Sequence, residues 1–64
     1  MINMQELKDH LLELVVVTKY ADHFAMPPYM VDEEEAFEYY SNNLHFKIEV
    51  DDSVADIINR ASKH

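Results

Sequence analysis

Hydrophobic residues in the first third of the chain recur at helical spacing. Projected at about 3.6 residues per turn, one side of such a helix carries Met4, Leu7, Leu11, Leu14, Val15, Thr18 and Ala21. Asn3, followed by Glu6 three positions later, is a variant of the capping box that begins many helices. The pattern predicts a helix that starts after Asn3 and turns this leucine-rich side toward the core.

A second apolar stripe lies on the acidic side of the same segment. It consists of Leu12, Val16 and Tyr20, which are spaced four residues apart. Either the helix is buried on two sides, or this stripe is a self-association surface that joins two copies of the chain. A third interpretation ends the helix near Leu12 and makes residues 14–18 a strand, because β-branched residues favour strands.

Two prolines separate this segment from a second predicted helix. Pro27 and Pro28 interrupt the helical pattern, because proline disfavours helix at the residue before it, and residues 25–31 are expected to form a connector. Asp32 with Glu35 repeats the capping pattern, so a helix is predicted to begin there. Its end is expected at residues 42–43, where two asparagines tolerate the left-handed conformation.

Residues 44–50 alternate between apolar and polar side chains. The apolar positions are Leu44, Phe46, Ile48 and Val50. Strict alternation is typical of a half-buried strand. A lone strand leaves backbone donors and acceptors unpaired, so we expect it to pair with residues 14–18 or with a second copy.

A final helix is predicted from Asp51, Asp52 and Ser53 onward, because Val54, Ile57, Ile58 and Ala61 follow helical spacing. The predicted fold class is therefore α+β: one small domain over residues 1–64, in the order helix, connector, helix, strand, helix.

Composition adds a strong charge to this plan. The 64 residues include thirteen acids and five bases, so the net charge is −8. This charge disfavours direct binding to nucleic acid or to anionic membranes and favours a partner protein with a basic surface. Since 48% of the residues are hydrophobic, the chain is too apolar for a disordered acidic tail.

The sequence offers little for catalysis or for metal binding. It contains no cysteine and no glycine, which excludes thiolate metal sites and glycine-rich phosphate loops. Glu6, His10 and Glu13 have a usable ligand spacing, but a solvated helix face with a stabilising Glu–His pair explains them better. We expect no enzyme activity, no cofactor and no metal.

Acidic and aromatic residues are the candidate binding groups. The carboxylates expected to steer a basic partner are Glu33, Glu34, Glu38, Asp51, Asp52 and Asp56. Tyr20 and Tyr39 are candidate anchors, because tyrosine supplies contact area and a hydrogen bond at low entropic cost. Glu34 and Glu38 lie one helical turn apart, which is close to the spacing of successive phosphates on a nucleic-acid strand.

In size and charge the chain is similar to phage-encoded inhibitors, including anti-CRISPR proteins and other DNA mimics. This resemblance assigns no role to any residue. It implies an inhibitor or modulator that docks on a basic surface of a nucleic-acid-handling protein. The alternative is a self-associating structural or accessory subunit, a possible homodimer.

The longest apolar run, residues 14–17, is far shorter than the ~20 residues that span a bilayer. The first six residues lack the positive region of a signal peptide. We therefore expect a cytoplasmic protein.

Overall fold

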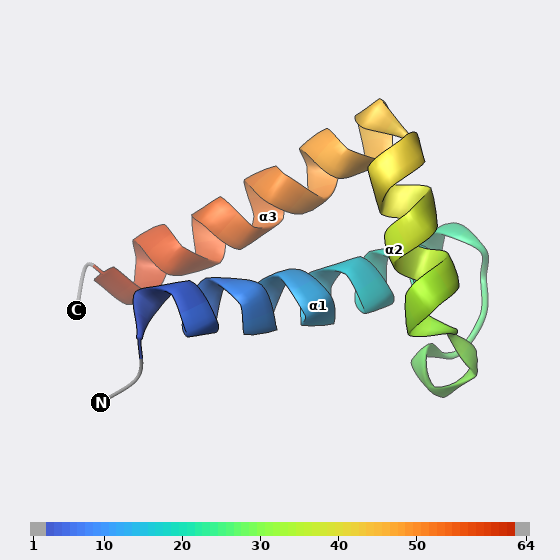
Figure 1. Cartoon of the computed structure of the whole chain (residues 1–64), viewed down its shortest axis with the longest axis horizontal. Coiled ribbons are helices and arrows are strands. Elements are labelled where there is room, and N and C mark those ends of the chain that lie inside the picture. The colour runs from blue at the N-terminus through green and yellow to red at the C-terminus, as the bar shows by residue number, and fades with distance from the viewer. Residues whose placement is uncertain (1–2, 63–64) are drawn as a thin grey trace.

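Three α-helices and one short 3-10 helix make up the described part of the chain, residues 3–62. A computed structural model describes residues 3–62, in which α1 spans Met4–His23, η1 Pro28–Met30, α2 Glu33–Asn42 and α3 Leu44–Ser62. Figure 1 shows α1 and α3 side by side and antiparallel, with the start of α1 and the end of α3 at the same end of the pair. α2 lies across the opposite end, and it contacts both long helices.

The first two helices begin at the predicted residues. The Asn3 Oδ1 atom accepts a hydrogen bond from the Gln5 backbone N–H at 3.0 Å, and the Asp32 carboxylate accepts one from the Glu34 N–H at 3.0 Å. Each side chain satisfies a donor that the first turn of a helix leaves without a partner. Both predicted helix starts are confirmed.

The end of α1 is closed without glycine. Ala25 takes the left-handed conformation, with φ of 52°. The Met26 N–H then donates to the carbonyl oxygen of Ala21 at 2.9 Å, which satisfies one of the last free carbonyls of α1. A left-handed alanine costs about 1 kcal/mol, so this turn is held by its surroundings.

The predicted α+β fold class is wrong, because no strand occurs among residues 3–62. Residues 44–50 form the first two turns of α3, and residues 14–18 lie within α1. Asn43, in an extended rather than left-handed conformation, begins α3: its Oδ1 atom accepts from the Phe46 N–H at 3.0 Å. The helix start predicted at Ser53 is therefore too late: Ser53 lies inside α3, and its hydroxyl donates to the Glu49 carbonyl at 3.0 Å.

The alternation of residues 44–50 conceals a helical repeat. Phe46, Val50 and Val54 are spaced four apart and are all buried, whereas Leu44 and Ile48 are exposed. A strand here would need a partner for its backbone groups, and the expected partner is helical. A helix pairs backbone donors and acceptors within its own segment and needs no partner strand. The pattern of residues 44–50 is therefore realised as a helix.

The core lies where all three helices meet. It consists of Val16, Ala36, Tyr40, Phe46, Val50 and Val54, with Leu12 and Tyr20 among the half-buried residues packed against it. α1 therefore faces the core with its second apolar stripe, and Val16 is fully buried within the single chain. Of the three interpretations of this segment, a long helix that turns the stripe into the core of its own chain agrees with the structure, because residues 14–18 are helical and the fully buried Val16 is not accessible to a second copy.

The leucine-rich side of α1, predicted to be its core side, is covered only in part, with Leu11 and Val15 packed against the core. Met4 and Leu14 are 59% and 52% exposed. Periodicity indicates which residues share a side of a helix, but it does not indicate which side a neighbouring helix covers. That choice is made by the positions of both α2 and α3, which supply the core residues around Val16.

Candidate protein-docking site

A surface pocket of about 340 Å³ brings tyrosines and glutamates together between α1 and α2. It is lined by Tyr20 of α1 and by Glu35, Glu38, Tyr39 and Asn42 of α2. We call these five residues the tyrosine–glutamate pocket. The α2 members lie on one side of the helix, because their spacings of three, four and seven residues match whole helical turns.

Contacts between aromatic rings restrain the side chains of one wall of this pocket. The rings of Tyr20 and Tyr39 meet edge to face, with centroids 5.8 Å apart. The Phe24 ring lies 4.6 Å from that of Tyr20 and 5.3 Å from that of Tyr39. Such pairs contribute about 0.5–1.5 kcal/mol each beyond burial of area, so the two tyrosines are held before any partner arrives.

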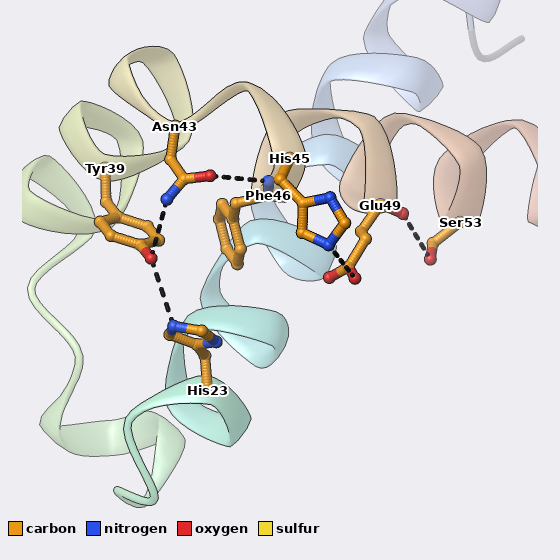
Figure 2. Close-up of polar contacts among 7 residues, drawn as sticks. All are labelled: His23, Tyr39, Asn43, His45, Phe46, Glu49 and Ser53. Atoms are coloured by element: carbon orange, nitrogen blue, oxygen red, sulfur yellow. Dashed lines mark hydrogen bonds and ion pairs between the residues drawn. The ribbon is translucent and has the colours of Figure 1, made fainter.

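The Tyr39 hydroxyl is also held by hydrogen bonds to Asn43 and His23, two residues that lie outside α2 (Figure 2). The Asn43 side-chain amide donates to this hydroxyl oxygen at 3.0 Å, and the hydroxyl lies 3.2 Å from His23 Nε2. A hydroxyl both donates and accepts, so it can accept from Asn43 and at the same time pair with His23, in a direction set by the tautomer of the ring. The same Asn43 side chain begins α3, so the tyrosine is tied to all three helices.

The carboxylates of the pocket come from an acidic helix start. Glu33, Glu34 and Glu35 occupy the first turn of α2, where the positive end of the helix dipole favours them. Glu38 follows Glu35 by three residues, so both carboxylates reach the pocket beside Tyr39. Carboxylates next to tyrosine rings are suited to a lysine or arginine side chain, which gains an ion pair and a cation–π contact.

Three of the predicted binding residues, Tyr20, Tyr39 and Glu38, are therefore gathered in one site. Sequence reasoning missed Glu35 and Asn42, although their spacing from Glu38 and Tyr39 on the predicted helix was an available signal. Glu33 and Glu34 are exposed in the same first turn but do not line the pocket.

The acids of α3 do not join this site. Asp51 accepts a hydrogen bond from the Tyr40 hydroxyl and pairs with Lys47 Nζ at 3.2 Å. Asp56 pairs with Arg60 at 3.2 Å, and Asp52 is exposed. Asp51 and Asp56 project about 140° apart around the helix, so these acids and those of α2 do not form one continuous array.

The Tyr40–Asp51 contact changes the titration of both groups. Burial, followed by the hydrogen bond and the charge of Asp51, raises the pKa of Tyr40 to about 12. The hydrogen bond from Tyr40 is the main reason that the pKa of the Asp51 carboxyl lies below its usual value, with Lys47 assisting. This pair joins α2 to α3 and has a structural role.

Other kinds of site find no support in the described part of the chain. Within residues 3–62, no three carboxylate or imidazole side chains meet in an arrangement that could hold a metal ion. None of the described helices combines the length and the apolar character needed to cross a membrane.

The fold defines an all-helical, three-helix domain with an acidic surface. Comparison of the chain with protein-family models, with curated proteins and with solved structures found no match.

Proposed function

We propose that this chain is a small protein-binding inhibitor or modulator that docks on a basic surface of a partner. The tyrosine–glutamate pocket carries the proposal. In it, Glu35 and Glu38 stand beside two tyrosine rings whose positions are set by packing and hydrogen bonds. A basic side chain of the partner enters between the carboxylates and the rings, and the net charge of −8 steers the approach.

The partner belongs to the class of proteins that handle nucleic acid. Such proteins carry clustered lysines and arginines that attract phosphate, and the same clusters attract an acidic domain. Docking there blocks the groove in which the partner binds nucleic acid. The chain then inhibits its partner without catalysing a reaction. Since the acids of α2 and α3 are not one array, the proposal depends on the pocket and not on an imitation of the phosphate backbone along both helices.

The test is a titration of the isotopically labelled chain with an arginine-rich peptide. The amide chemical shifts of the chain are measured by NMR at each peptide concentration. We expect the largest shifts at the five pocket residues, and we expect the affinity to fall as salt rises, because the contact is ionic. The double variant Glu35→Gln/Glu38→Gln should weaken binding at least tenfold at low salt.

A matched variant separates the pocket from general attraction. Glu6→Gln/Asp52→Asn removes the same two charges at exposed positions outside the pocket, and it should retain most of the affinity. Equal weakening by both double variants would show that the peptide responds only to net charge, and the proposal would then fail. Capture from a cell lysate with the native chain, eluted by salt, would identify the partner.

A further inference from the structure

A second pocket, of about 450 Å³, is lined by side chains of all three α-helices. This volume lies within the ~300–1,000 Å³ that is typical of small-molecule sites. No residue of this pocket belongs to the tyrosine–glutamate pocket. We call it the lysine–aspartate pocket, after its side chains with charged or amide groups, which come from α1 and α3: Gln5, Lys8, Asp9, Lys47 and Asp51.

The lysine–aspartate pocket also has an apolar part. It consists of Leu12 of α1, the Tyr40 ring of α2, and Val54 and Ala55 of α3. Tyr40 and Val54 belong to the buried core, and Leu12 packs against it. The apolar part is therefore fixed by the fold, and a ligand with a hydrocarbon group gains free energy by covering it.

Contacts within the protein hold the polar side chains of the pocket in place. Asp51 accepts the hydrogen bond from the Tyr40 hydroxyl and pairs with Lys47 Nζ at 3.2 Å. The same Nζ atom lies 5.7 Å from the centre of the Tyr40 ring. In α1, Gln5 Nε2 donates to Asp9 Oδ1 at 3.1 Å. Side chains that are already ordered lose less entropy when a ligand binds.

Three groups of the pocket keep hydrogen-bonding capacity that the described residues do not use. The Lys8 ammonium group has no carboxylate of residues 3–62 within ion-pair distance. Lys47 has three N–H donors, of which Asp51 accepts one. The second carboxylate oxygen of Asp9, Oδ2, receives no hydrogen bond from residues 3–62. Two ammonium groups and one carboxylate oxygen are therefore available to a ligand.

The charges of the pocket favour a ligand that carries both signs. The net charge of −8 repels an anion, and a cation meets the two ammonium groups of the pocket. A zwitterion has no net charge, and it can place its carboxylate on Lys8 and Lys47 and its ammonium group on Asp9. We propose that the lysine–aspartate pocket binds a small zwitterion, of the class of α-amino acids with an apolar side chain, whose hydrocarbon group covers the apolar part.

The test is a titration of the isotopically labelled full chain with leucine near neutral pH, with amide chemical shifts measured by NMR at each concentration. We expect saturable shifts at the residues of the lysine–aspartate pocket and a dissociation constant of about 10 mM or lower, as ordinary ligand efficiency gives for a molecule of this size. Two analogues keep the hydrocarbon group of leucine and lose one charge each: isocaproate lacks the ammonium group, and isoamylamine lacks the carboxylate. Each should bind about tenfold more weakly, because charged hydrogen bonds are lost.

Variants that remove one charge assign each end of the ligand. Lys8→Gln should weaken leucine binding about tenfold but should not weaken isoamylamine, because the amine has no carboxylate for Lys8 to contact. Asp9→Asn should weaken leucine but not isocaproate, which has no ammonium group. Lys19→Gln is the control: it removes the same charge from α1 at a position outside the pocket and should leave leucine binding unchanged. Circular dichroism checks that each variant stays helical.

Leucine that produces no saturable shifts would overturn the proposal. So would isocaproate or isoamylamine that binds as tightly as leucine, because the pocket would then recognise a single charge. Equal weakening by Lys8→Gln and Lys19→Gln would also overturn it, since binding would follow net charge and not the pocket. None of these results bears on the tyrosine–glutamate pocket, which is tested with a basic peptide and shares no residue with this one.

Discussion

Tyr40 and Asp51 show how one contact serves as a structural tie. Tyr40 is 9% exposed and donates its hydroxyl proton to Asp51, eleven residues later on the next helix. The folded-state pKa of Tyr40, about 12, lies above its ordinary value of 10.0. The contact therefore contributes fully to the stability of the folded chain below pH 10, and this contribution is lost as the pH rises toward 12. At the acid end, Asp51 contributes above its unfolded-state pKa of about 4 and loses that contribution as the pH falls.

Replacing Tyr40 by phenylalanine should remove the dependence of the unfolding free energy on pH at the alkaline end. The free energy of unfolding of the wild type is expected to fall between pH 10 and pH 12, because folding opposes ionisation of the buried phenol. Urea denaturation followed by circular dichroism measures this slope, and Tyr40→Phe should flatten it. Tyr29→Phe is the control, since Tyr29 is 85% exposed; a slope that persists unchanged in Tyr40→Phe would contradict the assignment.

At the scale of the element, α3 owes its start to one asparagine. Asn43 caps the helix with its side chain and accepts the Lys47 N–H with its backbone carbonyl at 2.9 Å. With that start, position 50 faces the core and position 48 faces solvent. A strand would have placed both on the same face, so the two positions distinguish the two structures.

Paired truncations test this orientation. Val50→Ala removes two buried methyl groups and should cost about 2–3 kcal/mol of unfolding free energy. Ile48→Ala removes more atoms but should change it by less than about 0.5 kcal/mol, because the side chain is exposed. Urea denaturation of both variants measures these differences. Similar losses at the two positions would mean that they share a buried face, contrary to the helix.

For the whole molecule, the distribution of charge is the dominant feature. Thirteen acids are carried by a molecule of 34 × 22 × 18 Å, so many lie within the ~10 Å screening length of 0.1 M salt. Two exposed ion pairs of the described residues, Lys47–Asp51 and Arg60–Asp56, offset little of this repulsion. The folded chain is compact at the cost of holding like charges together.

Added salt should therefore stabilise the folded chain. We expect the urea midpoint to rise with NaCl, because screening relieves repulsion more than it weakens exposed ion pairs. The measurement belongs at a protein concentration where sedimentation shows a monomer, so that association does not contribute. KCl should act equally. A midpoint that falls with salt would show that the ion pairs outweigh the repulsion.

Local information in the sequence determined the helix starts at Asn3 and Asp32, the acidic start of α2 and the spacing of both apolar stripes of α1, because caps and periodicity act within a few residues. It also brought Tyr20, Tyr39 and Glu38 forward as binding candidates. Tertiary structure decided the rest. Residues 44–50 are helical because residues 3–62 supply no strand to pair with them. Val16 is buried and Leu14 exposed because α2 and α3 pack against the Val16 side of α1, and which side a neighbour covers depends on contacts between segments far apart in the chain.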